Sequence, residues 1–468
     1  MSVTYKPTIG LEIHAELKTQ TKMFCDCLND ASEKHPNVNI CSICTGQPGA
    51  LPTINKQAVE HVLKVGLALG GEVFADKESK FDRKNYFYPD LPKGYQVSQY
   101  DQPLVTGGEL NKIRLIRIHL EEDAGRLSHS KEDSLVDYNR AGVPLMELVT
   151  EPDIKSSAEA ASFAKELQLL LRYLGVSDAD MEKGHMRLEA NISLNMGTKV
   201  EVKNINSFKA MEDAIKYELA RQEKLLKANK KVSHETRGWN DVKKVTVSQR
   251  SKEEAQEYRY FPEPDLPPFD EKSFNIKSIK ADVPELPQNK RERFKKEYSL
   301  TSKQADVLVQ NMAAAGYFEE AASELGDVKK TNLLFNYFTS DVWGLMKKRS
   351  VDINGLNISP AHLAHVIELV ADKRITSRIA KNLLLKMHET SLDPSEIIAN
   401  EEWEQVSDES SLKPLAKQII KDHPQPVADY KKGKSQSIQF LIGMAMSELG
   451  GKADPNVLKG IFEELLKD

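Results

Sequence analysis

The chain has 468 residues, of which 40% are hydrophobic and 29% charged, and its formal net charge is −5. This size is enough for two or three domains with separate cores, while the acidic balance excludes a surface that binds nucleic acid over its whole extent. The sequence has no run of 18 apolar residues and no signal peptide at its start, so we expect a soluble protein of the cytoplasm.

The first predicted element is a strand over residues 9–17, where apolar side chains occupy every second position. Glu12 and His14 lie between them, so both belong on one face of a half-buried strand. Three later alternating segments carry polar side chains in the same way, namely Arg117, His119 and Glu121, then Glu189, then Glu201. Four strands can therefore share one carboxylate-rich face. Its like charges repel unless a cation neutralises them.

Carboxylates with one imidazole suit magnesium or manganese, since hard cations prefer carboxylate oxygens. Such an ion could bridge phosphates, although the sequence contains neither GxxxxGK[ST] nor GxGxxG, the usual phosphate-binding loops. Seven basic side chains could neutralise phosphate charge. The alternative for each of them is a solvated surface charge. They are Arg83, Lys84, Arg140, Lys203, Arg250, Lys252 and Arg259.

All four cysteines fall within residues 25–44, as Cys25 and Cys27 followed by Cys41 and Cys44. Disulfides are disfavoured in the cytosol, and two close thiolate pairs separated by a loop suit tetrahedral structural zinc. The alternative is a set of buried, inert thiols, with His35 in the loop as a substitute ligand.

Two aromatic and proline-rich runs, residues 86–92 and 260–267, resemble each other in composition. Proline makes such loops rigid, and their tyrosines serve either as packing anchors or as stacking surfaces for a base. Between them, Glu147 has apolar neighbours that predict partial burial. A buried carboxylate needs a partner, and the sequence leaves open whether that is Arg140 or a metal ion.

Alternating segments and turns dominate the first 290 residues, with helices expected over residues 158–174 and 210–226. After residue 290 the pattern becomes helical, with start signals at Thr301, Ser359 and Asp393. An acidic stretch near residue 402 precedes a lysine cluster and an apolar helix over residues 438–446. We therefore predict a sheet-centred domain over 1–290, a helical domain over 291–402 and a small tail domain over 403–468.

Five long segments of unusual composition are Gly10–Leu17, Arg83–Tyr95, His119–Gly125, Asn139–Asp153 and Ser248–Pro267. Through them the chain resembles the B subunits of tRNA-dependent aspartyl/glutamyl-tRNA amidotransferases over its whole length. The resemblance implies an α+β protein with a cradle-like catalytic domain, an all-helical domain and a helical tail of the YqeY type that reads the tRNA.

The resemblance also implies a reaction. ATP phosphorylates the side-chain carboxylate of Glu on glutamine tRNA, or of Asp on asparagine tRNA, and ammonia then displaces phosphate to give the amide. The resemblance thus implies a ligase that forms carbon–nitrogen bonds with glutamine as nitrogen donor. An amidase-type A subunit would supply the ammonia, and a small C subunit would complete the heterotrimer.

Carried onto this sequence, the resemblance assigns magnesium to Glu12, His14, Glu121 and Glu147. Strand alternation favours Glu121 over Glu122 and Asp123. Further contacts to ATP or a second ion would come from Lys84, Arg140, Glu189, Glu201 and Lys203. The family commonly has Asp at position 189, and zinc cysteines occur in only some of its members.

In the tail, the resemblance assigns tRNA binding to Lys431, Lys432, Lys434 and Lys452. Ser447 and Gly450 stand where the family typically carries lysine, which should weaken phosphate contact. An alternative function is a tRNA-binding scaffold with structural zinc and no chemistry of its own, but it leaves the carboxylate face unexplained. A free-standing ligase for a small carboxylate would need no such tail.

Overall fold

The computed structural model describes residues 5–467 except 31, 131, 252–257 and 404–408. Lys252, the side chain of Arg250 and part of the acidic stretch near residue 402 therefore lie outside the described part. The chain divides into two compact units, Met1–Pro287 and Gln288–Asp468. Within the described residues, no helix combines the length and apolar content that a membrane span needs.

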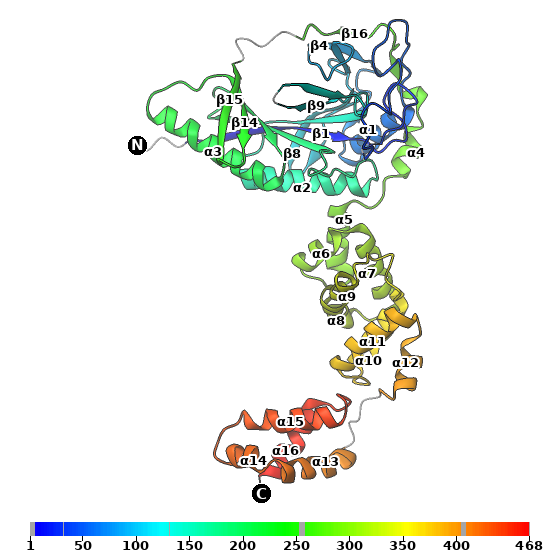
Figure 1. Ribbon diagram of the computed structural model, residues 1–468, viewed down its shortest axis with the longest axis vertical. Coiled ribbons are helices and arrows are strands. Elements are labelled where there is room, and N and C mark those ends of the chain that lie inside the picture. The colour runs from blue at the N-terminus through cyan, green and yellow to red at the C-terminus, as the bar shows by residue number, and fades with distance from the viewer. Residues whose placement is uncertain (1–4, 31, 131, 252–257, 404–408, 468) are drawn as a thin grey trace. The chain divides into compact units, whose positions relative to one another are not determined.

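A ten-stranded sheet forms the centre of the first unit, in the order β15-β14-β13-β12-β1-β11-β8-β6-β2 with β7 paired to β8 (Figure 1). Its described pairs are antiparallel, except that β13 and β14 are parallel. The strands are β1 (Pro7–Glu16), β2 (Glu72–Val73), β6 (Val105–Thr106), β7 (Glu109–Leu110), β8 (Ile113–Glu122), β11 (Pro144–Thr150), β12 (Met186–Leu194), β13 (Val200–Ile205), β14 (Glu235–Asn240) and β15 (Val245–Ser251).

The alternation of the sequence decides which face of this sheet is covered. Every second residue of β1 is apolar and almost fully buried, as Leu11 and Ile13 are, and these side chains join the core beneath the sheet. Helices α1 (Lys56–Ala68), α2 (Ser157–Tyr173) and α3 (Phe208–Lys227) contribute their apolar faces to the same core. Figure 1 shows α2 and α3 running along one face of the sheet. Their predicted positions are confirmed.

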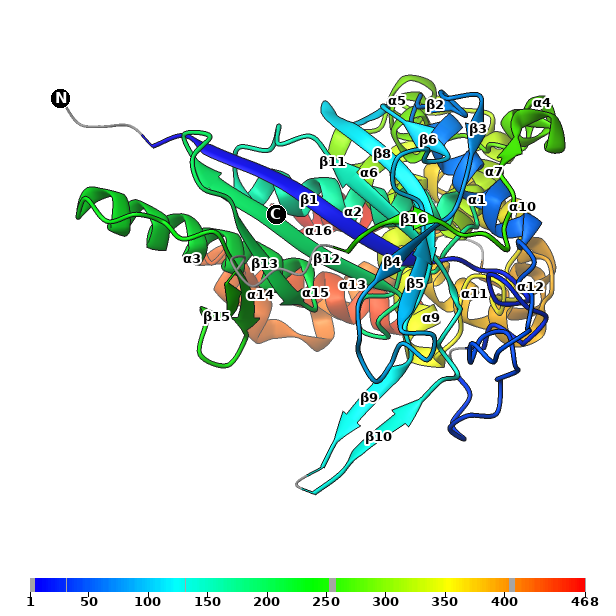
Figure 2. The same ribbon diagram turned by 90° about the horizontal axis from the view of Figure 1, so that it is seen from above.

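Shorter elements of the first unit lie away from α2 and α3 (Figures 1 and 2). Three strands form one small sheet, two others pair with each other, and β9 and β10 make a hairpin. The elements are β3 (Glu78–Ser79), β4 (Asp82–Asn85), β5 (Tyr95–Ser98), β9 (Arg126–His129), β10 (Ser134–Asp137), β16 (Phe261–Pro262), β17 (Phe269–Asp270), η2 (Glu271–Ser273) and α4 (Ile276–Ala281). Because α1, α2 and α3 pack on the apolar side chains of the large sheet, its polar side chains are free to line a cavity.

In its described residues the second unit is helical, as the sequence predicts. The three expected start signals cap helices: Thr301 forms a complete capping box with Gln304, and the side chains of Ser359 and Asp393 accept from backbone N–H groups. These helices are α5 (Pro287–Glu297), α6 (Ser302–Val309), α7 (Met312–Leu325), η3 (Val328–Lys330), α8 (Thr331–Tyr337), η4 (Phe338–Val342), α9 (Trp343–Arg349), α10 (Pro360–Ala371), α11 (Ser377–Thr390) and α12 (Pro394–Glu401).

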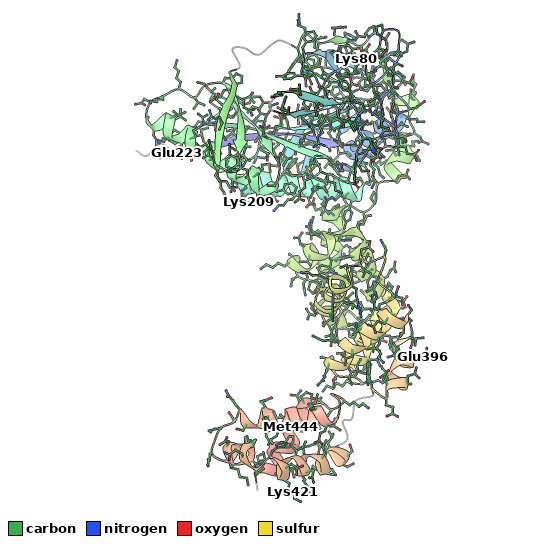
Figure 3. The ribbon with its side chains drawn as sticks, in the orientation of Figure 1. Lys80, Lys209, Glu223, Glu396, Lys421 and Met444 are labelled. Atoms are coloured by element: carbon green, nitrogen blue, oxygen red, sulfur yellow. The ribbon has the colours of Figure 1, made fainter. Side chains whose placement is uncertain are left out.

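The last four helices have an apolar cluster of their own, formed by residues such as Leu412, Leu441 and Phe462. Lys421 and Met444, labelled in Figure 3, lie on the first and third of these helices. They are α13 (Glu409–Asp422), α14 (Pro424–Lys431), α15 (Ser437–Glu448) and α16 (Pro455–Leu466). The sheet-centred unit followed by helices confirms the predicted α+β fold class, and the division into domains at residues 290 and 402 stays a prediction.

Candidate active site

Strand register brings the predicted polar side chains together on one face of the large sheet. His14 on β1 lies opposite Glu147 on β11, and Glu147 lies opposite His119 on β8. On the other side of β1, Glu12 is paired with Glu189 of β12. Neighbouring strands are about 4.8 Å apart, so this register alone places several carboxylates within reach of one ion.

The first group on this face comprises His14, Glu121 and Glu147, each with one ligand atom within 4.8 Å of the others. The Nε2 atom of His14 is 3.5 Å from a carboxylate oxygen of Glu121 and 3.5 Å from one of Glu147. His119 Nε2 contacts the same Glu147 oxygen at 3.2 Å, and Ser98 donates to Glu121 at 3.1 Å. These contacts hold the ligand atoms in place.

The electrostatics of this group depend on the two imidazoles. Burial would raise the pKa of Glu147, but the charges and hydrogen bonds of His119 and His14 hold it well below its ordinary value. Burial would lower the pKa of His14, but its hydrogen bond to Glu147 and the charges of Glu147 and Glu121 raise that pKa to about 9. At neutral pH a proton on His14 therefore supplies the positive charge that the carboxylates require.

A second group comprises Glu12, Glu189 and Glu201, whose ligand atoms also lie within 4.8 Å of one another. Lys203 Nζ is 3.0 Å from Glu189 and 3.4 Å from Glu201. Asn191 donates to Glu12 at 2.7 Å, yet burial and the nearby Glu147 and Glu189 raise the pKa of Glu12. Carboxylate oxygens in both groups, with one imidazole in the first, are a donor set that fits Mg²⁺ or Mn²⁺.

Glu121 is the member of its acidic run that faces the first group. Glu122 instead pairs with Lys93 and accepts from Val97 N–H at 2.9 Å. Asp123 pairs with Arg187 at 2.7 Å and with Arg140 at 3.3 Å, and these arginines keep its pKa low against the effect of burial. Alternation along the strand therefore separated Glu121 from Glu122 correctly, whereas Asp123 also lines the cavity and is distinguished from Glu121 by its arginine partners.

The sequence left open whether Arg140 is the partner of Glu147, and in the structure the two residues have different partners. The ion partners of Glu147 among the described residues are His14 and His119. Arg140 pairs with Asp123 and donates to the carbonyl oxygen of Ala124, and it is absent from the described lining of the cavity. The contact between Arg140 and ATP therefore stays a prediction, and the position of Arg140 does not support it.

The cavity over this face has a volume of about 980 Å³. Four cationic side chains line it, namely Lys84, Arg117, Arg187 and Lys203. The sequence placed Arg117 on the polar face but not among the side chains that neutralise phosphate, and Arg187 was not selected, although the alternation of Arg187, Glu189 and Asn191 along β12 was a signal for it. Burial would lower the pKa of Lys84, but Glu121, Glu147 and neighbouring phenols raise it, so Lys84 stays charged.

The two aromatic runs of the sequence meet at one wall of the cavity. Strand β16 pairs with β4. Tyr258, two residues before the second run, lies with its ring centroid 5.7 Å from that of Tyr86 and 6.0 Å from that of Tyr260. Lys84 Nζ lies 5.1 Å from the Tyr258 ring centroid. Five aromatic residues line the cavity on this side: Tyr86, Phe87, Tyr88, Tyr258 and Tyr260.

The four cysteines also come together, with their sulfur atoms within 4.8 Å of one another. Hydrogen bonding from Cys25, with a smaller contribution from the charge of Lys22, lowers the pKa of Cys44 to about 5. Lys22 is fully buried and its Nζ lies 3.8 Å from Cys44 Sγ. His35 is not part of the group; its Nδ1 contacts Glu33 at 2.9 Å.

The segment that carries the cysteines, residues 25–46, contacts Lys93. Gly46, just after the last cysteine, has φ +67°, and a Cβ atom there would come within 2.3 Å of Lys93 Cγ. Lys93 is the partner of Glu122. The turn that carries Cys41 and Cys44 therefore supports a charged pair next to the candidate site.

In the second unit, the four lysines selected from the sequence lie at helix ends and in loops. Lys431 ends α14, Lys432 and Lys434 follow it, and Lys452 lies between α15 and α16. Lys434 contacts Asp429 at 3.3 Å. Lys431, Lys432 and Lys434 are exposed, so their charges are available to a polyanion.

Comparison with known proteins gives matches over both units. Residues 7–276 match the family described as the GatB/GatE catalytic domain, and residues 316–466 match the GatB domain. Proteins named as the B subunits of aspartyl/glutamyl-tRNA(Asn/Gln) amidotransferases are similar over nearly the whole chain. They include those of Dehalococcoides mccartyi (44% identical, 99% of each chain), Thermotoga maritima (43%, 99% of each) and Thermosipho melanesiensis (46%, 99% of this chain and 100% of the relative).

The raised pKa of His14 leads to a prediction about metal binding. Because a ligating imidazole must lose its proton and the pKa of His14 is about 9, each metal ion bound at neutral pH displaces one proton. The affinity for Mn²⁺ should rise about tenfold from pH 7 to pH 8. Titration followed by electron paramagnetic resonance measures this, with His14→Gln as the control that loses the slope. An affinity that is independent of pH would contradict ligation by His14.

Proposed function

The chain belongs to the GatB/GatE family, and we propose that it is the B subunit of an enzyme that amidates Glu on glutamine tRNA or Asp on asparagine tRNA. The observation that carries the proposal is the cavity of about 980 Å³ in which two acidic groups face four cationic side chains and an aromatic wall. A site with both charges suits an anionic cosubstrate and a metal ion.

The proposed chemistry consists of two steps. The γ-phosphoryl group of ATP passes to an oxygen of the amino acid's side-chain carboxylate, giving an acyl phosphate and ADP. Ammonia then attacks the carbonyl carbon, and the carbon–oxygen bond to phosphate breaks to leave the amide. A carboxylate is a poor electrophile until its oxygen becomes part of a phosphate leaving group, so the first step is the one that needs this site.

The residues of the chain perform separate tasks in this scheme. His14, Glu121 and Glu147, with Glu12, would hold magnesium, which when bound neutralises phosphate charge. We propose that Glu189 and Glu201 hold a second ion or orient Lys203, because their ligand atoms lie close to those of Glu12 and both contact Lys203.

Cationic side chains reduce the repulsion between the two anions that must meet. Lys84, Arg187 and Lys203 line the cavity and retain their charges, because neighbouring carboxylates raise the pKa of each. Their positive charge favours the approach of ATP to the substrate carboxylate.

The partners follow from the reaction. At neutral pH ammonia in solution is mostly protonated and cannot act as a nucleophile, so we assign its supply to an amidase-type A subunit that hydrolyses glutamine, with a small C subunit in a heterotrimer. The complex acts as a ligase with glutamine as nitrogen donor. We place it in the cytoplasm, where charged tRNA is used.

We propose that the four cysteines bind structural zinc. Four sulfur ligands complete a tetrahedral site and leave no position for substrate. Four thiolates around Zn²⁺ have a net charge of −2, and the buried ammonium of Lys22 offsets part of it. Two backbone carbonyls, of Asn39 and Tyr138, accept from the same Nζ at 2.7 and 3.2 Å, so the lysine is held in place without a carboxylate.

The principal test uses the purified heterotrimer with mischarged tRNA. In Glu12→Gln and Glu147→Gln, tRNA-dependent phosphate release should fall at least a hundredfold while glutaminase activity survives, because each variant removes a charge that the site needs for the metal ion. Glu223→Gln, on the exposed side of α3 (Figure 3), is the matched control. Phosphate release at the wild-type rate in both variants would leave the chain as a tRNA-binding scaffold.

A second prediction concerns the cysteine cluster. Lys22→Met removes the buried charge while keeping most of the volume, and the affinity for zinc should fall about 10- to 100-fold, as for other groups that contact metal ligands. Competition with a chromogenic chelator measures the affinity directly. Lys18→Met is the control, since Lys18 is exposed and pairs with Asp178. Equal zinc affinities in the two variants would rule out a role for Lys22.

The tail gives a third prediction. Reversing Lys432 and Lys434 to Glu should raise the KM for charged tRNA several-fold and reduce its dependence on salt, because phosphate contacts are lost. ATP hydrolysis at saturating tRNA should be nearly intact. Lys459→Glu, on α16, is the control that reverses a single lysine elsewhere in the tail. An unchanged KM in the double variant would show that these lysines do not contact the tRNA.

A further inference from the structure

Phe87 has the most exposed aromatic side chain in the described part of the chain, at 77%, and Tyr88 beside it is 56% exposed. Both line the cavity that contains the acidic groups. An exposed phenylalanine ring gains nothing from burial in the chain itself. Its position at the mouth of a substrate cavity therefore points to a ligand.

The loop that carries these rings is firmly anchored. It joins β4 to β5, and Tyr138 Oη donates to Pro89 O at 2.9 Å while Gly125 N–H donates to Asp90 O at 2.8 Å. Two turns within it are closed by N–H donation from Leu91 to Tyr88 O and from Gly94 to Leu91 O, each at 3.0 Å. A ligand that meets the loop does not have to order it first.

Gly94 lies next to the Phe87 ring. Its φ of +74° is accessible to glycine at little cost, and a Cβ atom there would come within 2.9 Å of Phe87 Cε1. The edge of the ring at Cε1 and Cδ1 thus lies close to Gly94, and the side chain is otherwise largely exposed.

We propose that Phe87, with Tyr88 beside it, is a stacking platform for an adenine base, and that this base is the unpaired 3′-terminal nucleobase of the charged tRNA. The proposal rests on the function proposed above. The amino acid is esterified to the terminal ribose, so the reacting carboxylate lies only about 6–8 Å from that ribose, by covalent bond lengths. When the carboxylate reaches the acidic groups, the terminal base must meet the wall of the same cavity.

The adenine of ATP could stack on the same rings, but the exposure of Phe87 and Tyr88 favours the terminal base of the tRNA as their ligand. A small ligand is usually buried over most of its surface, whereas these rings face the solvent from which a polymer enters. Aromatic rings in such positions bind successive unpaired bases through their π-faces, without hydrogen-bond readout. Tyr258 and Tyr260, which line the same cavity, remain available to ATP.

The test compares kcat/KM for charged tRNA and the KM for ATP in the assembled heterotrimer. Phe87→Ala should lower kcat/KM for charged tRNA about tenfold, in line with the loss of one base–aromatic stack, with the KM for ATP changed less than twofold. Phe87→Leu should show most of the same loss because it keeps apolar volume but has no π-face. Phe87→Tyr should stay within twofold of wild type.

Met196→Ala is the matched control, since Met196 is 76% exposed and is absent from the described cavity lining. Three results would overturn the proposal: a rise in the KM for ATP alone, full activity of Phe87→Leu, or loss of the heterotrimer in Phe87→Ala as judged by size-exclusion chromatography. The last would make the ring a contact between subunits. If wild-type protein itself fails to amidate mischarged tRNA, the proposed function fails and not the platform alone.

Discussion

The constraint on which the site depends is the repulsion among carboxylates that strand register places on one sheet face. Glu12, Glu121, Glu147, Glu189 and Glu201 belong to two groups whose ligand atoms lie within 4.8 Å of one another. Partly desolvated like charges at such distances repel by several kcal/mol. A proton on His14 and the ammonium of Lys203 offset part of this repulsion, and in the proposed reaction a bound metal ion takes the place of the His14 proton.

The remaining fold of the first unit keeps these charges from separating. The apolar side chains that alternate with them are buried against α1, α2 and α3, and a shift of register by one residue would move the whole polar set into that core. The cysteine segment and the loop after β4 add further contacts, through Lys93 and through the aromatic wall. Apolar packing elsewhere in the first unit thus stabilises the acidic face against the repulsion of its own side chains.

Alternation and helix-start signals were sufficient to predict β1, β8, β12 and β13, the acidic face that they share and the capped helices, because each depends on residues close in sequence; β11, which carries Glu147, was not predicted. They also oriented Glu121 correctly relative to Glu122. They did not identify the partner of Glu147, because His14 and His119 come from other strands. Arg187 with Asp123, Lys22 with Cys44, and Tyr86 with Tyr258 are likewise brought together only by tertiary packing.

The central claim is that the substrate's side-chain carboxylate becomes an acyl phosphate in this cavity, and oxygen isotopes test it most directly. Glutamine tRNA would be charged with glutamate labelled with ¹⁸O in its side-chain carboxylate and converted by the heterotrimer with ATP and glutamine. The account predicts that each amide formed releases one inorganic phosphate carrying a single ¹⁸O atom. Unlabelled phosphate, with amide formed at the normal rate, would contradict it.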